Sequence, residues 1–349
     1  MTELGPAEPG APGSPGSPAD PAAWREASFA APPRRPIFEL EGRAAPGLYG
    51  AGWLLTAVGC ASIFVAFAAT GGGPGTFLLG VGGLGALTLG LVAAAGAQGL
   101  QRKADGIAGY AGPSPFIVLA AALTGSLLVS ALLSATGLFG GGTPLALLVG
   151  VLISGAFYLG LIGLLVVGTG ALTWAEMGFR RPTAPALAGD LGAGFVLGVV
   201  ALFATAFVAA ILVTLLGVEP VGPVPVPTSI ADEVVDLLAA AIVAPIVEEV
   251  FFRGFATTAW ARRIGPSRAI LRGALFFALV HVLTIGGADA SQALRIAMIA
   301  FVARIPVAFL LGWVFVRRDS LWASIALHAT FNGVALVLAD LAGRTVTGG

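Results

Sequence analysis

Nine long apolar segments follow one another along this chain and leave it little choice of fold. Each has the length of about 17–25 residues that an α-helix needs to cross a bilayer. Only 10% of the residues are charged and 57% are hydrophobic, whereas a soluble domain has about 25% charged residues. We therefore predict an all-α polytopic membrane protein with about nine transmembrane helices. The segments lie near 48–70, 75–99, 116–138, 143–169, 190–216, 234–256, 268–286, 292–316 and 321–341.

The chain begins with a stretch of different composition. Residues 1–46 are rich in Pro, Gly, Ala and Ser and cannot bury enough apolar surface to fold. They also lack the basic start and apolar core of a secretory signal. We expect a disordered cytoplasmic tail over 1–46, N-terminal transmembrane helices of unknown role over 47–176, and a second helical unit over 177–349.

The basic residues alternate from loop to loop. The loops after the second, fourth, sixth and eighth apolar segments are basic. No Lys or Arg occurs in the loops between them, which are GGGPG, FGGGTP, VEPVGPVPVPTSIADE and IGGADASQ. The positive-inside rule then predicts a cytoplasmic N-terminus and an external C-terminus, and we expect the membrane to be a bacterial plasma membrane. The apolar segments make the lipid bilayer an expected partner. Because the 18 basic and 18 acidic residues balance, we expect no nucleic acid as a partner. The basic loops carry Arg102 and Lys103, Arg180 and Arg181, Arg262, Arg263 and Arg268, and Arg317 and Arg318.

Three ionisable residues interrupt the sixth apolar segment. A charge at the bilayer centre costs roughly 2.5–3.5 kcal/mol on insertion scales, so such residues usually have a function. Glu249 and Arg253 are four residues apart on a helix, so they share a face and can pair. Glu248 points about 100° away and has no cation nearby on its own helix, which suits a general base. Taken alone, Glu249–Arg253 is equally well explained as a structural ion pair.

Both histidines of the chain also lie in apolar segments. His281 shares a helix face with Phe277, and His328 shares one with Asn332. An imidazole beside an amide offers two hydrogen-bond donors, which suit an oxyanion or a carbonyl. A carboxylate base, an imidazole and a donor pair together indicate a hydrolase site that activates water.

These residues form motifs that resemble a known family. EEVFFR (248–253) fits EExxxR, FALVH (277–281) fits FxxxH, and HATFN (328–332) fits HxxxN. The same order of motifs is found in the CPBP family of intramembrane proteases, which includes type II CAAX prenyl endopeptidases and bacteriocin-processing and immunity-type proteins. MGFRRP (177–182) is similar to a short element that precedes the family's core. The resemblance covers roughly 177–343 and implies that 177–349 is a protease core.

The resemblance implies a role for each matching residue. Glu248 would activate the attacking water with help from His281, while His328 and Asn332 would form the oxyanion hole. The enzyme would be an intramembrane endopeptidase of the glutamic type or a metallo-endopeptidase. Its substrates would be membrane-embedded or lipidated proteins or peptides, including prenylated, CAAX-like ones. The four catalytic residues would thus be Glu248, His281, His328 and Asn332.

Glu249 and Arg253 would support these four residues, and no cofactor would be required. Zinc is the alternative, with Glu248, His281 and His328 as its ligands around an open position for water. We favour the metal-free reading because His328 and Asn332 suit the role of donors better than that of ligands.

Two other classes of function fit the sequence less well. A membrane scaffold or immunity factor with the same fold would keep the helices without catalysis. A proton-coupled transporter would also place carboxylates and histidines inside the membrane. Transporters usually show inverted repeats and broken helices in both halves, whereas the polar residues of this chain are concentrated in its C-terminal half.

Overall fold

The computed structural model describes residues 36–37, 39–69, 73–137, 143–218, 229–283 and 285–347 of the 349-residue chain. Most of the predicted tail over 1–46 lies outside the described residues. Within them the fold is all-helical, and seven helices are long and apolar enough to cross a membrane. These are α1 (Pro46–Ala68), α2 (Pro74–Ala104), α3 (Pro115–Ala135), α4 (Pro144–Ile162, continued to Val167 by the π-helical stretch η1, Gly163–Val167), α5 (Ala184–Leu216), α10 (Ala290–Arg318) and α11 (Leu321–Thr347).

Proline marks the start of most of these helices. It occupies one of the first two helical positions in α1, α2, α3, α4 and α5. The backbone N–H that proline lacks has no partner at these positions anyway, and its fixed φ is already helical. The prolines that close the polar loops in the sequence therefore also set where the membrane helices begin.

The predicted segment 234–256 lies within a longer helical run that is not uniform. The run consists of α6 (Ile230–Leu237), the π-helical stretch η2 (Leu238–Val243), α7 (Ala244–Glu249), the π-helical stretch η3 (Val250–Thr257) and α8 (Thr258–Ile264). Pro245 is the second residue after η2. Its ring would clash with the carbonyl four residues earlier in a regular α-helix, and a wider π turn relieves that clash. Such π stretches often mark functional sites.

The predicted helix 268–286 is shorter than expected. Helix α9 spans Pro266–Val280, and His281 is the residue that caps its C-terminal end. A helix of this length rises about 22 Å, which falls short of a hydrocarbon core of about 30 Å. The sequence continues to be apolar to Ile285, and for that reason composition alone could not reveal the earlier end. His281 thus lies at a helix terminus and not in the middle of a membrane helix.

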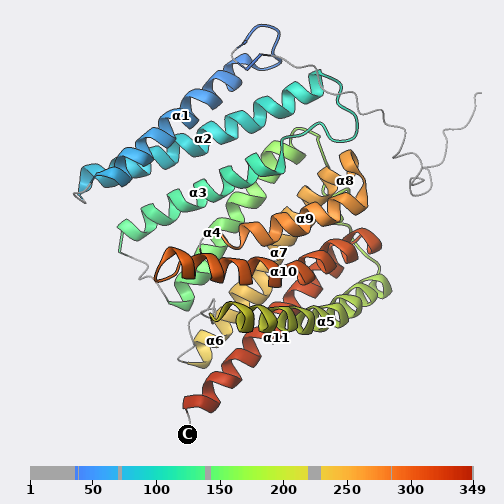
Figure 1. The fold of residues 1–349 in the computed structure, drawn as a ribbon. Coiled ribbons are helices and arrows are strands. Elements are labelled where there is room, and N and C mark those ends of the chain that lie inside the picture. The colour runs from blue at the N-terminus through green and yellow to red at the C-terminus, as the bar shows by residue number, and fades with distance from the viewer. Residues whose placement is uncertain are drawn as a thin grey trace, which may run out of the picture.

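The helices form a layered bundle (Figure 1). Helices α1, α2 and α3 lie side by side at one edge, and α5, α10 and α11 pack together at the other. Helix α4 and the run from α6 to η3 lie between these groups and contact each other. The larger hydrophobic core includes Phe251 and Phe255 of η3, which are fully buried. The run that carries Glu248 is therefore at the centre of the protein.

Glycine brings α5 and α11 close together. A Cβ atom added to Gly194 would lie 2.6 Å from the carbonyl oxygen of Ala323, and one added to Gly198 would lie 2.8 Å from that of Leu327. Glycines four residues apart allow two membrane helices to approach closely. This contact fixes the position of α11. His328 directly follows Leu327, the residue that Gly198 contacts.

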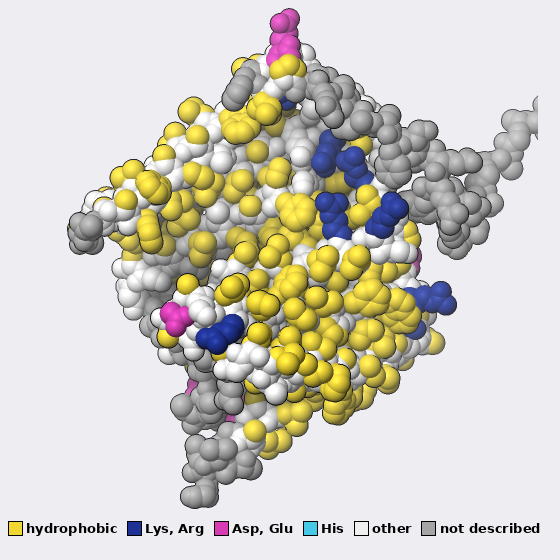
Figure 2. Space-filling view, viewed as in Figure 1, with side chains coloured by type: hydrophobic (Ala, Val, Ile, Leu, Met, Phe, Trp, Pro, Cys, Tyr) yellow, Lys and Arg dark blue, Asp and Glu magenta, His cyan; other side chains and the backbone are white. Residues whose placement is uncertain are grey.

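The outer surface fits a membrane environment. Figure 2 shows hydrophobic side chains over most of the visible face, with most of the visible Lys and Arg side chains at the end where α8 and the start of α9 lie. Phe67 is 90% exposed and Phe207 is 69% exposed. Aromatic side chains exposed to this extent across whole helices indicate contact with lipid and not with water.

Candidate active site

Two histidines from different helices converge on one glutamate oxygen. Nε2 of His281, at the end of α9, lies 3.5 Å from Oε2 of Glu248 in α7. Nε2 of His328, in α11, lies 4.0 Å from the same oxygen. Oε2 of Glu248 is buried and makes no hydrogen bond within the described part of the chain. A buried polar atom without a partner is unusual and calls for a water or a catalytic role.

The other nitrogen of each imidazole is held in place. Nδ1 of His281 donates to the carbonyl oxygen of Phe277 at 2.8 Å, and Nδ1 of His328 lies 2.8 Å from Oε1 of Glu249. Because a carbonyl and a carboxylate only accept, the proton in each case belongs on Nδ1. Each neutral ring then presents an unprotonated Nε2 toward Glu248. The two anchors thus orient both rings and select their tautomer.

Glu249 has the opposite environment to its neighbour Glu248. It is fully buried and accepts hydrogen bonds from Arg253, Ser324 and His328. The Arg253 Nη1–Oε1 distance is 2.8 Å. A buried carboxylate with three donors is a satisfied structural group. Glu249 connects η3 to α11 and positions His328.

Arg253 is itself buried and has several contacts. Its Nη2 donates to the carbonyl oxygen of Ala308 in α10 at 3.3 Å. The guanidinium carbon lies 4.4 Å from the centre of the Phe277 ring, a cation–π contact. The same Phe277 ring packs against His281 and His328, with ring centres 4.2 and 5.7 Å apart. Arg253 and Phe277 together form the wall behind the two histidines.

Asn332 repairs a gap in the backbone of η2. The N–H of Ala244 donates to Ala239, and the next residue, Pro245, has no N–H. Pro245 therefore cannot donate to the carbonyl of Ala240, the next acceptor in the π pattern, and Nδ2 of Asn332 donates to that carbonyl at 2.7 Å. This contact places Asn332 against η2, one helical turn after His328. Its second Nδ2 hydrogen is the one available for an oxyanion.

A cavity of about 430 Å³ adjoins Glu248 on the side of α3 and α4. Tyr158 of α4 lines it, and its ring packs edge-on against Phe251 at 5.0 Å. The N-terminal helices, whose role the sequence left open, therefore contribute a wall beside the candidate site. Small and polar residues make up much of the lining, among them Ser130, Gly150, Ser154, Gly155, Tyr158 and Glu248.

The MGFRRP segment holds the start of α11. Gly178 has φ of +80°, and a Cβ there would lie 2.8 Å from the Phe315 ring, so glycine is required. Its carbonyl oxygen accepts from the N–H of Leu321 at 3.2 Å, and the indole of Trp322 donates to Arg180 at 3.0 Å. The segment thus fixes the first turn of α11, two turns before His328.

An ion pair ties the preceding loop to α8. Arg262 donates to Oε1 of Glu176 at 2.7 Å. Partial burial raises the pKa of the Glu176 carboxyl, but hydrogen bonds from Arg262 and Thr173 outweigh this effect and hold the pKa below its ordinary value. The pair is partly exposed to solvent and therefore contributes little stability.

The structure brings the sequence-predicted site residues together from four elements. Glu248, His281 and His328 face one another, Glu249 and Arg253 lie directly behind them, and Asn332 contacts η2. Their catalytic roles stay predictions. Ser324 and Tyr158 were not identified from the sequence. Ser324 lies one turn before His328 on α11, which was an available signal, whereas nothing in the sequence links Tyr158 to Glu248.

Metal use stays a prediction. Among the residues that the structure describes, no group of three or more His, Cys, Asp and Glu side chains is arranged to hold a metal ion. The three residues named above as zinc ligands do face one another across one oxygen, however. Both imidazoles also have the anchored Nδ1 that metal-binding histidines usually show.

Part of the chain matches the model of a known protein family. Residues 230–334 match the family model of type II CAAX prenyl endopeptidase Rce1-like proteins. This range contains every predicted site residue from Glu248 to Asn332, and the match supports the CPBP family membership that the motifs indicated. The MGFRRP segment lies before the matched range. No curated protein and no solved structure matches the chain.

Proposed function

We propose that this chain, which belongs to the CPBP family through residues 230–334, is an intramembrane endopeptidase that hydrolyses peptide bonds with a glutamate-activated water. The supporting observation is the unpartnered, buried Oε2 of Glu248, to which two oriented imidazoles present Nε2. The family supplies the class of intramembrane protease. The catalytic residue types and their geometry favour the glutamate mechanism within that class.

The proposed first step takes place between Glu248 and His281. A water bound at Oε2 gives a proton to the Glu248 carboxylate, and its oxygen attacks the carbonyl carbon of the peptide bond. His281 hydrogen-bonds the same water through Nε2 and orients it. When the tetrahedral intermediate collapses, the C–N bond breaks and the proton passes from Glu248 to the leaving amine.

The proposed oxyanion hole consists of His328 and Asn332. Since Nδ1 of His328 already donates to Glu249, Nε2 can donate only in the doubly protonated ring, so His328 would take up one proton from solvent before the attack and keep it through the reaction. The Glu249 carboxylate would stabilise that imidazolium, and Arg253 pairs with the same carboxylate at 2.8 Å. Asn332 adds the second hydrogen of its Nδ2. Both donors would act on the charge that develops in the transition state.

The substrate would be a membrane-embedded or lipidated protein. The cavity between Glu248 and α4 supports entry of a peptide segment beside the catalytic carboxylate. We propose that no metal is needed, so chelators should have little effect. Loss of activity with a chelator and its recovery with zinc would move Glu248, His281 and His328 to the role of ligands.

Membrane proteomics tests this function without a known substrate. Cells that express the wild-type protein or Glu248→Ala are compared for new peptide ends in their membrane fractions, with Glu41→Ala at an exposed position as the matched control. We expect new peptide ends that appear equally in cells with the wild-type protein and in cells with Glu41→Ala. These ends should be absent from cells with Glu248→Ala. Identical ends in all three samples would favour the non-catalytic scaffold.

A further inference from the structure

A second cavity lies far from Glu248 along the chain, among the first three helices. It has a volume of about 560 Å³ and is bordered by the start of α1, the end of α2 and the start of α3. The family match does not include these helices. The cavity therefore needs an explanation of its own. Its lining includes Arg43, Tyr49, Trp53, Leu91, Gln98 and Arg102.

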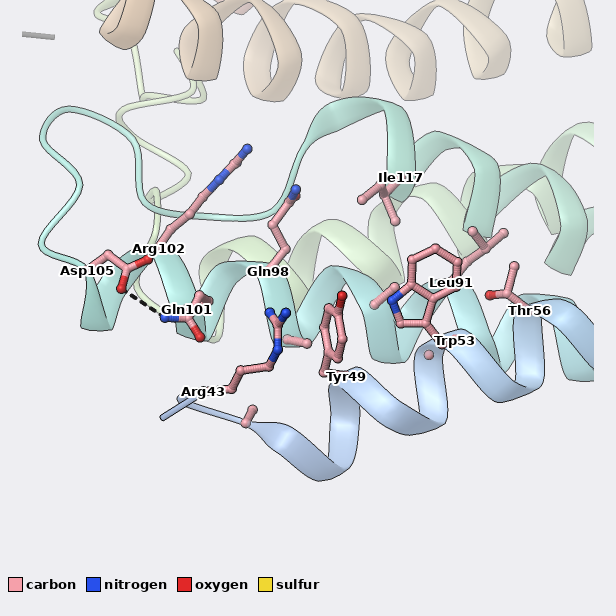
Figure 3. Close-up of a pocket in the computed structure, with 14 residues that line it drawn as sticks. Arg43, Tyr49, Trp53, Thr56, Leu91, Gln98, Gln101, Arg102, Asp105 and Ile117 are labelled. Carbon is pink, nitrogen blue, oxygen red and sulfur yellow. Dashed lines mark hydrogen bonds between the residues drawn. The ribbon is translucent and has the colours of Figure 1, made fainter. Parts of the chain in front are cut away.

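The lining is divided into a polar end and an apolar end (Figure 3). Arg43, Gln101 and Asp105 lie at one end, and Trp53, Leu91 and Ile117 lie at the other, as the close-up shows. From Gln101 to Leu91 the cavity follows α2 for roughly 15 Å. A ligand that fills it must be polar at one end and apolar over the rest.

The polar end carries more positive than negative charge. Arg43 and Arg102 both line the cavity, and Arg263 is close enough to Arg102 to add to the positive potential. Asp105 is the one carboxylate of the lining, and it accepts a hydrogen bond from Gln101 at 2.9 Å. Within the described ranges, no ion pair joins a carboxylate to Arg43 or Arg102. This end favours an anion.

The arginines and glutamine are held in position without a ligand. The guanidinium carbon of Arg43 lies 3.6 Å from the centre of the Tyr49 ring, and Nη1 of Arg102 donates to the carbonyl oxygen of Gly112 at 2.7 Å. Oε1 of Gln98 accepts from the N–H of Ser114 at 2.5 Å, so its Nε2 remains as a donor. Preorganised donors bind an anion with a smaller entropic cost.

We propose that this cavity binds one anionic phospholipid. The phosphate would lie among Arg43, Arg102 and Gln98, and one acyl chain would run along Trp53, Leu91 and Ile117. The polar end of the cavity is lined by Arg102, in the basic last turn of α2, and a lipid headgroup would lie at this end of a membrane helix. Basic pockets between membrane helices on the positively charged side typically bind such headgroups. The inference does not depend on catalysis.

Thermal unfolding of the delipidated full-length protein in detergent tests the site. Dispersed phosphatidylglycerol should raise the unfolding midpoint, while phosphatidylcholine with the same acyl chains should raise it much less. Arg102→Gln and Arg43→Gln should each weaken the apparent affinity for phosphatidylglycerol about tenfold, as expected for one lost charge-assisted hydrogen bond. Lys103→Gln, which removes an equal charge at the next, exposed position, should leave the affinity unchanged.

Three results would overturn the proposal. Equal protection by phosphatidylcholine would mean that the headgroup is not recognised. An equal loss of affinity in Lys103→Gln would indicate a general surface charge effect. Full protection by glycerol 3-phosphate without acyl chains would indicate a free-phosphate site. Because Arg102 also donates to the carbonyl oxygen of Gly112, Arg43→Gln serves as the variant that keeps the α2–α3 loop intact. Native mass spectrometry should count one retained phosphatidylglycerol per chain.

Discussion

At the residue scale, the site depends on two adjacent glutamates with opposite environments. Glu249 is fully buried and has three hydrogen-bond donors, whereas Oε2 of Glu248 has none among the described residues. The side chain of Glu248 is 28% exposed and that of His281 is 26% exposed, so both can reach a substrate. Glu248 is therefore suited to chemistry, and Glu249 is suited to positioning.

Arg253→Ala should destabilise the protein by about 3–5 kcal/mol, because it leaves the buried Glu249 carboxylate without its cation. Arg262→Ala removes the partly exposed pair with Glu176 and should cost about 1 kcal/mol or less. Thermal unfolding in detergent checks both variants. Equal losses would mean that burial does not distinguish the two ion pairs.

His328→Ala and Asn332→Ala should each slow peptide cleavage roughly 10²–10³-fold, as expected for a lost oxyanion donor. Asn332→Ala should also lower the unfolding midpoint, because the carbonyl of Ala240 loses the hydrogen bond from this side chain. Single-turnover rates and unfolding curves separate the two effects. A variant of either residue that cleaves at the wild-type rate would remove that residue from the oxyanion hole.

At the scale of elements, close helix contacts set the geometry of the site. Helix α11 carries His328 and Ser324, and it is held by α5 at Gly194 and Gly198. The π turn before Pro245 exposes the carbonyl to which Asn332 donates. The catalytic geometry therefore depends on where α11 packs.

Gly194→Leu should push α11 away from α5, because a Cβ there already meets the carbonyl of Ala323 at 2.6 Å. Overpacking of this kind costs about 1–3 kcal/mol and should reduce cleavage. Gly192 on the same helix has no atom within 4 Å of an added Cβ, so Gly192→Leu is the matched control. Similar unfolding midpoints and activities for the two variants would contradict the proposed packing role.

Helical periodicity explains how much of these elements the sequence could predict. The four-residue spacing predicted that Glu249 pairs with Arg253 and that His281 lies beside Phe277. It could do so because the two residues of each pair lie on the same helical run. Tyr158 reaches the site through packing between helices, which spacing along the chain does not encode. Ser324 lies four residues before His328 on α11, so its spacing was a signal that we did not use. The end of α9 at Val280 was missed because apolar composition continues past it.

At the scale of the whole molecule, positive charge gathers at one end of the bundle. The ends of α2, α8 and α10 carry basic residues in their last turns, and Figure 2 shows most of the visible Lys and Arg side chains at that end. The membrane orientation itself stays a prediction of the positive-inside rule. The polar end of the proposed lipid cavity, lined by Arg102 in the last turn of α2, lies at the same charged end.

Cysteine labelling from outside intact cells tests the orientation. In a background where the single native cysteine is removed by Cys60→Ala, Gly286→Cys should be modified and Arg263→Cys should not. Gly286 is exposed and an added side chain there meets no atom within 4 Å. The reverse pattern of labelling would invert the predicted topology.

The central claim is that Glu248 activates the water that cleaves the peptide bond. The most direct measurement compares purified wild-type protein, Glu248→Gln and Glu41→Gln in bilayers, with a peptide identified by the membrane comparison and with H₂¹⁸O as solvent. Wild-type protein and Glu41→Gln should form ¹⁸O-labelled carboxyl ends at similar rates. Glu248→Gln should be slower by about 10²–10⁴-fold, since an amide cannot accept the proton, with an unchanged unfolding midpoint. Full activity of folded Glu248→Gln would contradict the mechanism.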